Sequence, residues 1–421
     1  MKVTLPQNMW QGFQPIEIEL PDDWEVEIHG IKADTMPALS LEELRARINR
    51  PYGLKPLREL AKGKQRVAIL FDDISRATPT EILARIVLDE LHAAGIQKEQ
   101  IRFICALGCH GAHGRDEFVQ KLGRDILENY HVFNHNCYEN LVKVGTASKG
   151  YDVLLNREFM SCDLKIGIGS MLPHVFNTFG GGGKIVCPGV AGIDTIQHTH
   201  VAAIEFAKEH GIISAATMGD LRVTAMRQEI EEICGMIGTF FKIDCMFNTR
   251  QEIVDLYAGD VIEEYYAAVP VAQEIYRTQR AVDKQLIICN ANARSNEATI
   301  AYQLATLACG ADGAEIVMID HSARGQVTHY LLGTFGEQAP GRLFRNEPNR
   351  EELVRRIICY MPYYVSTDSY FFGEREKQVV ARTWGEVMAL LKDYGPGTKC
   401  SILVDGTMEY FALDDVAPPK G

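Results

Sequence analysis

The residue types best suited to chemistry gather in one short segment, residues 172–200. Four consecutive glycines, residues 180–183, are followed directly by Lys184, and His174 and His200 lie on either side of this run. Glycine lets the backbone approach a ligand closely, and successive backbone amides can bind an anion. The segment therefore predicts a ligand site that Lys184 faces. A flexible turn with a solvated lysine is the alternative that the sequence leaves open.

The glycine run matches neither of the two common phosphate-binding motifs. A P-loop needs a glycine five residues before its Gly-Lys pair and a hydroxyl residue after it. These positions hold Thr178 and Ile185. A dinucleotide fingerprint is begun by Gly167 and Gly169, but its third glycine position holds Leu172. The segment is therefore predicted to be neither of these nucleotide sites.

The histidines divide into candidates for chemistry and residues with structural roles. His198 and His200 lie two apart, so on a helix they point to different sides, and at most one can be a metal ligand. The sequence contains no HExxH motif or Cys/His spacing typical of a zinc site. A structural histidine is the alternative at each position. Five histidines are interpreted as surface residues: His29, His92, His131, His135 and His210.

Short apolar runs alternate with helical patterns, which is typical of an α/β fold. Strands are expected at 67–71, 101–107 and 164–168, with a helix at 80–91. Polar or glycine-rich residues follow four strand ends, at 72–79, 108–114, 173–184 and 290–297. Ligands collect at the carboxyl ends of strands in open α/β sheets, so these segments are expected to form one site.

Four of these strand-end residues leave open alternatives. One of His110 and His113 is either a catalytic base or a histidine that caps the following helix. Asp73 and Arg76 either form an ion pair within their turn or contact a ligand, since arginine binds carboxylates and phosphates through two nitrogens.

The outer parts of the chain predict a hairpin, two capped helices and a second domain. Residues 16–20 and 24–28 alternate around a turn and predict a β-hairpin. Ser40 with Glu43, and Thr383 with Glu386, match the capping box. A turn-rich polar stretch is expected at 251–260, a helix at 267–280, a strand at 285–289, a helix at 297–309 and a strand at 314–318. We expect two α/β domains, 1–270 and 271–421, with the active site in the cleft between them.

Composition excludes several classes of protein. The 421 residues carry 56 acidic and 43 basic side chains, a net charge of -13, without the basic run expected of a nucleic-acid binder. Eleven cysteines without a CxxC pair indicate reduced thiols rather than a disulfide framework. No signal peptide or membrane span is recognised. A cytoplasmic protein without nucleic-acid or membrane partners is the expectation.

Taken in order, the strand-end residues resemble the lactate racemase family. The resemblance rests on Asp-Ile-Ser-Arg at 73–76, Gly-Cys-His at 108–110, Pro-His at 173–174, Gly-Gly-Lys at 182–184, and Thr195-Ile196 with His200. It extends over most of the chain, including the two-domain layout. These enzymes use a nickel-pincer nucleotide, a pyridinium mononucleotide whose sulfur and carbon atoms hold one nickel ion, made by cofactor-synthesis proteins.

The resemblance implies roles for individual residues. Lys184 would bond covalently to the cofactor, His200 would complete the nickel coordination, and His110 and His174 would be the two acid/base residues. The same interpretation places Asp73, Ser75, Arg76, Gly182 and Gly183 at the cofactor, and Arg76, Arg294 and Gln303 at the substrate. The implied reaction inverts the α-carbon of a 2-hydroxy acid by removing a hydride and the hydroxyl proton and returning the hydride to the other face.

Two positions depart from the pattern and indicate a changed substrate pocket. Gly111 stands where the family carries an arginine after the first histidine, and Thr306 stands where a lysine follows the pair Tyr302-Gln303. Arg294 is a candidate replacement cation, with a solvated arginine as the alternative. The expected function is an isomerase acting on a 2-hydroxy acid other than lactate. Another hydride-transfer reaction on a hydroxy acid, or ligand or cofactor binding without turnover, is the alternative.

Overall fold

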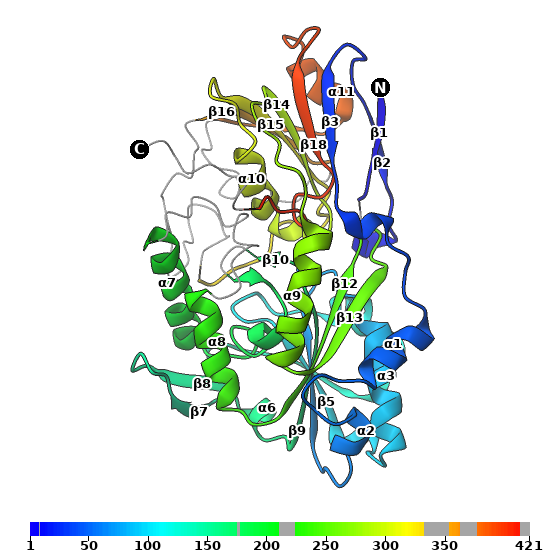
Figure 1. The fold of residues 1–421 in the computed structure, drawn as a ribbon, viewed down its shortest axis with the longest axis vertical. Coiled ribbons are helices and arrows are strands. Elements are labelled where there is room, and N and C mark those ends of the chain that lie inside the picture. Colours follow the sequence, from blue (N-terminus) through cyan, green and yellow to red (C-terminus); the bar gives the residue numbers. More distant parts are fainter. Residues whose placement is uncertain (8, 175–176, 210–223, 332–352, 363–376, 413–421) are drawn as a thin grey trace.

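The computed structural model describes residues 1–412 except 8, 175–176, 210–223, 332–352 and 363–376. Two six-stranded sheets, each covered on both faces, form the framework, with the first sheet in the lower half of Figure 1 and the second in the upper half. The expected α/β class is confirmed.

The first sheet is parallel except for one edge strand. Its order is β13 (Ile253–Asp260), β12 (Phe240–Phe247), β9 (Leu164–Ser170), β4 (Val67–Asp72), β5 (Ile101–Ala106) and β6 (His131–Asn134), and β13 is antiparallel to β12. In β4, Ile69 and Phe71 enter one hydrophobic core while Ala68 and Leu70 enter the other. A strand buried on both faces is apolar at every position, which explains the unbroken apolar run.

Different helices cover the two faces of this sheet. One face carries α1 (Leu41–Ile48), α3 (Thr80–Ala93), α4 (Arg115–Leu122) and α9 (Glu263–Tyr276). The other face carries α7 (Ile193–Glu209), α8 (Ala225–Gly235) and the hairpin of β7 (Leu141–Thr146) with β8 (Asp152–Asn156). The short helices are α2 (Leu57–Leu60), α5 (Arg124–Asn129) and α6 (Arg157–Met160).

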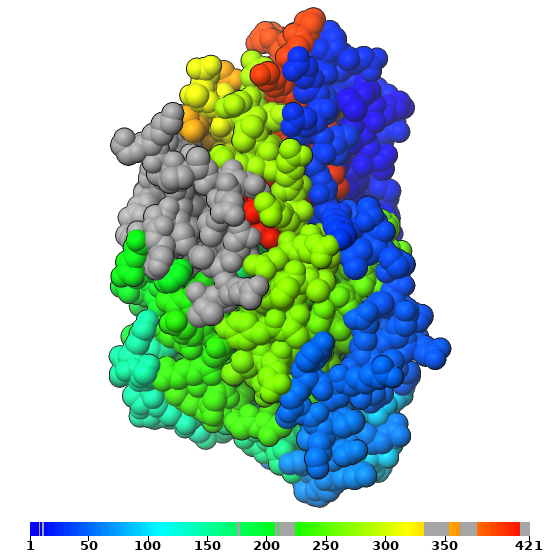
Figure 2. All heavy atoms as spheres, viewed as in Figure 1, coloured from blue at the N-terminus to red at the C-terminus, as the bar shows by residue number. Residues whose placement is uncertain are grey.

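The second sheet is wholly parallel. Its order is β17 (Gln378–Ala381), β16 (Val354–Tyr360), β15 (Ala314–Asp320), β14 (Leu286–Ala291), β18 (Lys399–Leu403) and β3 (Glu25–His29). Helix α10 (Thr299–Thr306) packs on one face and α11 (Trp384–Leu390) on the other. The N-terminal strands lie beside the C-terminal strand β18 at the top of Figure 2, although they are far apart in sequence.

The predicted N-terminal hairpin is wrong. Strand β2 (Ile16–Glu19) pairs antiparallel with β1 (Lys2–Leu5), whereas β3 pairs parallel with β18. Alternation of apolar and polar residues specifies a strand but not its partner, and the open edge of the second sheet supplies one for β3. The domain boundary at residue 270 stays a prediction. Because β3 pairs with β18, residues 25–29 from the N-terminal part of the chain belong to the second sheet.

Several other expectations can be compared with the structure. The polar stretch at 251–260 is strand β13, whose Asp255 forms an ion pair with Arg47 rather than lying in a turn. Ser40 and Glu43 form the expected capping box. Thr383 caps α11, but Glu386 accepts from the amide of Arg382.

The interpretation of five histidines as surface residues is partly wrong. His29 and His135 are buried, and His135 contacts the carbonyl of Ala191 at 2.9 Å through Nε2. His92 and His131 are exposed as expected, and His210 lies outside the described residues. No disulfide is found among the eleven cysteines, all of which lie in the described part of the chain. None of the helices in the described part of the chain has the length and apolar character needed to cross a membrane.

Candidate functional site

A cavity of about 220 Å³ opens at the carboxyl ends of the strands of the first sheet and is lined by residues from both sheets' connections. The four predicted strand-end segments meet there, as expected for an open α/β sheet. The predicted site residues that line it are Asp73, Ser75, Arg76, His110, His174, Lys184, His200, Arg294 and Gln303.

The glycine run is arranged differently from the prediction. Gly180 and Gly181 line the cavity, but Gly182 and Gly183 do not. The amide of Gly182 donates to Oδ2 of Asp244 at 2.5 Å, and a Cβ atom at Gly183 would overlap the thiol of Cys234. A contact of Gly182 and Gly183 with a cofactor stays a prediction. These glycines let the loop pack between Asp244 of β12 and helix α8.

Lys184 extends from this loop into the cavity. Its Nζ lies 3.1 Å from Nε2 of His174, and the side chain is half-buried. Burial, with the positive charges of Arg76 and Arg227 adding to it, lowers the pKa of Lys184 to about 7. A substantial fraction of this amine is neutral near pH 7, and the neutral form is the one in which a lysine amine can react as a nucleophile.

His110 is held between two carboxylates. Its Nδ1 contacts Oδ2 of Asp73 at 2.5 Å, and its Nε2 lies 3.7 Å from Oε1 of Glu297. Burial acts to lower the pKa of His110, but the charge and hydrogen bond of Asp73 outweigh it and raise the pKa. Because Nδ1 is committed to Asp73, Nε2 is the nitrogen that can exchange a proton with a ligand.

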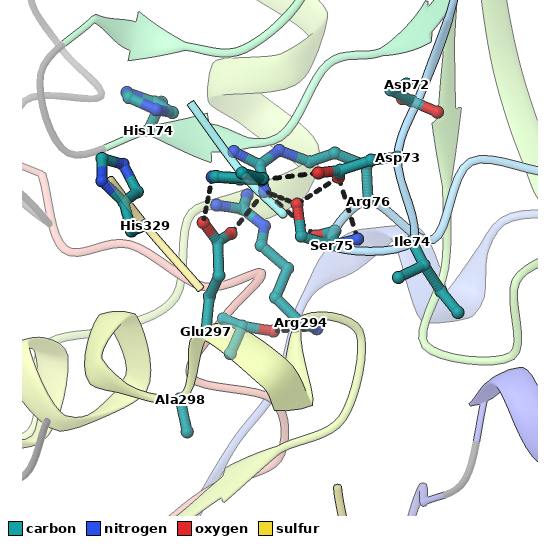
Figure 3. A network of polar contacts seen from close by, with 12 residues as sticks. Asp72, Asp73, Ile74, Ser75, Arg76, His174, Arg294, Glu297, Ala298 and His329 are labelled. Carbon is teal, nitrogen blue, oxygen red and sulfur yellow. Dashed lines mark hydrogen bonds and ion pairs between the residues drawn. The ribbon is translucent and has the colours of Figure 1, made fainter. Parts of the chain in front are cut away.

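Asp73 is fixed by its own turn, as Figure 3 shows. Its Oδ1 accepts from the amide of Ser75 at 2.9 Å and from the Ser75 hydroxyl. Burial opposes its charge, but His110 lowers the pKa of Asp73. Asp73 therefore remains ionised and orients the His110 ring.

Replacing Asp73 with asparagine is expected to reduce turnover by about 10²- to 10⁴-fold, because the His110 ring loses the group that fixes its tautomer. Asp73 raises the pKa of His110, so the variant should move this titration to lower pH. The pH profile of turnover measures both effects. An unchanged pH profile would show that Asp73 does not act through His110.

His174 has the opposite electrostatic setting. It lies in the short strand β10 (Pro173–His174), which pairs with β11 (Thr178–Phe179). Burial, followed by the charge of Lys184, holds the pKa of His174 well below its usual range. The cavity thus holds one histidine that favours its protonated form and one that favours its neutral form. Such a division is typical of acid/base pairs.

His200 lines the cavity with one ring nitrogen committed to the backbone. Its Nδ1 donates to the carbonyl of Ile196 at 2.8 Å, which directs the lone pair to Nε2. Burial and the charge of Lys184 lower the pKa of His200 to about 4, so the ring is neutral. His198 instead stacks on Tyr151 with ring centroids 4.3 Å apart, which confirms that only one of the pair faces the cavity.

Among the described residues, no group of three or more His, Cys, Asp and Glu side chains is arranged to hold a metal ion. His113 is not placed as a base or a helix cap, since its Nε2 accepts from the amide of Ile74 at 3.0 Å. It holds the loop that follows β4.

The sequence of this chain is similar to those of known proteins. Residues 11–211 match the family model of the lactate racemase N-terminal domain. A lactate racemase of Thermoanaerobacterium thermosaccharolyticum is 23% identical over 379 residues, covering 88% of this chain and 84% of that protein. Residues 11–211 belong to the lactate racemase family.

One further sequence relative and two solved structures are also similar to this chain. The Lactiplantibacillus plantarum lactate racemase is 29% identical over 222 residues, covering 52% of this chain and 51% of that protein. The solved lactate racemase apoprotein of T. thermosaccharolyticum has a TM-score of 0.70 at 19% identity, covering 98% of this chain and 100% of that chain. A Thermotoga maritima protein has a TM-score of 0.64 at 16% identity, covering 89% and 98%. These structural matches concern the fold.

Arg76 and Arg294 make contacts that the resemblance to the family did not predict. Arg76 forms no ion pair with Asp73 within the turn; it pairs with Glu297 and donates to the Ser75 hydroxyl at 2.8 Å. Arg294 is 1% exposed and donates to the carbonyl of Pro173 at 2.7 Å, so it is not a solvated side chain. Burial and the charge of Arg76 lower the pKa of Arg294 to about 9.

The two departures from the lactate racemase pattern have structural counterparts. Thr306 is buried outside the cavity and donates to the carbonyl of Gln303 at 2.8 Å. The amide of Gly111 donates to the carbonyl of Thr328 at 3.2 Å, and a Cβ atom at Gly111 would lie 3.4 Å from Cβ of Thr328. The chain near Thr328 therefore takes up the space beside Gly111.

Two residues of the site, Glu297 and His329, were missed as site residues from the sequence. His329 lines the cavity with ring centroids 5.2 Å from His110 and 6.5 Å from His200. Figure 3 shows Glu297 and His329 extending toward the centre of the same cavity. His329 follows β15, so the strand-end rule that found the other four segments would also have indicated this one.

Proposed function

We propose that this protein is a racemase or epimerase of a 2-hydroxy acid that carries a nickel-pincer nucleotide. The observation that carries the proposal is one cavity holding His110, His174, Lys184 and His200, with the two acid/base histidines in opposite electrostatic settings. Binding without turnover would not require both histidines near Lys184, and the 3.1 Å contact between Lys184 and His174 favours catalysis.

The residues of the cavity fit the proposed cofactor. Lys184 supplies an amine with a pKa of about 7 for covalent attachment, and His200 supplies a neutral imidazole with its tautomer fixed by Ile196. Asp73, Ser75 and Arg76 form the adjoining turn. When bound, the nucleotide would provide a reversible acceptor for the hydride of the substrate α-carbon.

The protein's own part in the reaction is proton transfer and orientation. With one enantiomer, one histidine accepts the hydroxyl proton as the α-carbon becomes planar, and the other enantiomer uses the opposite histidine. His110 is steered by Asp73 through Nδ1 and acts through Nε2. His174 acts from the Lys184 side. Arg294 and Gln303 are proposed to hold the substrate carboxylate.

Cofactor loading gives the first test. Protein produced together with cofactor-synthesis proteins is expected to contain about one nickel per chain and a mass adduct on the Lys184 peptide. Metal analysis and peptide mass spectrometry measure these outcomes. Absence of both from protein made with an active synthesis system would exclude the cofactor proposal.

A panel of D- and L-2-hydroxy acids tests the reaction itself. The loaded protein is expected to interconvert at least one pair without incorporating solvent deuterium at the α-carbon, because the hydrogen leaves and returns as a hydride. Chiral chromatography with mass detection gives both quantities. Full deuterium incorporation would instead indicate α-proton abstraction and overturn the mechanism.

A further inference from the structure

Glu297 comes from the second sheet's connections and lines the cavity beside residues that follow the strands of the first sheet. It ends the short turn before α10 and is directed toward the first sheet, where it pairs with Nη1 of Arg76 (Figure 3). Its side chain is 13% exposed, and its second oxygen lies 3.7 Å from Nε2 of His110. The turn itself is held by the amide of Glu297, which donates to the carbonyl of Arg294 at 2.8 Å.

The carboxylate of Glu297 therefore neutralises the cation at Arg76. Most charged groups lining the cavity are similarly matched by a partner: Asp72 with Lys121, Asp73 with His110, Arg76 with Glu297, and Lys242 with Asp244. Covalent attachment at Lys184 would remove its charge. This matching leaves little positive charge in the cavity to balance an incoming anion.

Arg294 is the exception. Its Nε and Nη1 are buried and have no hydrogen-bond partner among the described residues, while Nη2 is held by Pro173. A buried arginine with unsatisfied N–H groups is an anchor for one carboxylate. The rest of the lining includes the apolar side chains of Leu107, Ile300 and Val327.

We propose that Glu297 is a specificity-determining residue that restricts the site to monocarboxylic 2-hydroxy acids with an apolar side chain. This inference rests on the proposed function. A single substrate carboxylate binds Arg294. The second carboxylate of a diacid would find Arg76 already paired with Glu297. It would also lie beside the Glu297 carboxylate, and the repulsion between two like charges rejects such a ligand.

The test compares two substrates of similar size, 2-hydroxybutanoate and 2-hydroxysuccinate, in the loaded wild-type protein and in Glu297→Gln. The wild-type protein is expected to favour the monoacid by about 100-fold in kcat/KM, since like-charge contact costs several kcal/mol and 1.4 kcal/mol is tenfold. Glu297→Gln keeps the shape, removes the charge and should reduce this ratio by at least about tenfold, chiefly through the KM for the diacid.

The two substrates are compared within one variant. Any general effect of Glu297 on turnover through His110 therefore changes both rates alike and leaves their ratio unchanged. Glu315→Gln is a matched control, because Glu315 also pairs with a partly buried arginine, Arg356, but lies outside the cavity. Its substrate ratio should equal that of the wild-type protein. Glu297→Asp, which keeps the charge, should retain the preference for the monoacid and provides a second variant if the glutamine variant does not fold.

Calorimetric binding of both acids to the loaded proteins separates the inference from the proposed function. Preference for the diacid in the wild-type protein, or an equal ratio in the wild type and Glu297→Gln, would overturn the role of Glu297. Selective binding of the monoacid without interconversion of any hydroxy acid would overturn the proposed function while supporting the charge argument. Binding of neither acid would overturn both.

Discussion

Replacing Lys184 with methionine is expected to abolish the covalent adduct and to lower turnover by on the order of 10³-fold or more, comparable with the loss of a covalent catalytic group. Methionine has a similar length and no amine. The reason is the setting of Lys184, whose pKa of about 7 and position in the cavity make it the accessible nucleophile of the site. Peptide mass spectrometry and racemisation rates measure the two effects.

Lys165→Met is the matched control for this substitution. Lys165 is also a buried lysine with a lowered pKa, but it donates to the carbonyl of Cys162 at 2.8 Å and does not line the cavity. This control should retain both the adduct and turnover. An adduct that persists in Lys184→Met, with normal activity, would show that the cofactor is attached elsewhere or not covalently.

Replacing either His110 or His174 with alanine is expected to lower turnover by about 10²- to 10⁴-fold, the usual contribution of a positioned acid/base group. Each full inversion needs one histidine to accept a proton and the other to donate one. Both directions should therefore slow together. The double variant should fall little below the more damaging single variant, because the two groups act in one reaction sequence.

The pH profiles should separate the two histidines. Asp73 raises the pKa of His110, while burial lowers that of His174, so the remaining titration should lie at lower pH in His110→Ala than in His174→Ala. His131→Ala is the control, since His131 is exposed and outside the cavity. Normal racemisation by either alanine variant would remove that histidine from the proposed mechanism.

Local patterns were sufficient for much of the framework. The apolar run at 67–71 became β4, whose residues enter two cores, and the Ser40 box caps α1. Such features depend on burial and on hydrogen bonds between close neighbours, which are encoded locally. The strand-end rule also indicated seven of the nine predicted site residues that line the cavity, because parallel strands end at the same edge of a sheet.

Errors arose where the partner of an element lies far away in the chain. The alternation at 24–28 indicates a strand, but only the open edge beside β18 gives β3 its place. The polar residues at 251–260 indicated a turn-rich stretch. Residues 253–260 instead form β13, in which Arg47 forms an ion pair with Asp255. Likewise, Gly182 and Gly183 are needed for packing against Asp244 and Cys234.

The segment at 172–200 shows both kinds of information. Its residue types by themselves indicated a ligand site that Lys184 faces and at most one metal-ligand histidine at its end, whereas the roles of Lys184 and His174 were implied by the family resemblance. Tertiary structure decided the chemistry of these groups, because burial and charges from Arg76 and Arg227 lower the pKa of Lys184. The tertiary structure also forms the ion pair between Arg76, which follows β4 of the first sheet, and Glu297, which follows β14 of the second sheet. Charge pairing and desolvation depend on three-dimensional neighbours, and no local spacing specifies them.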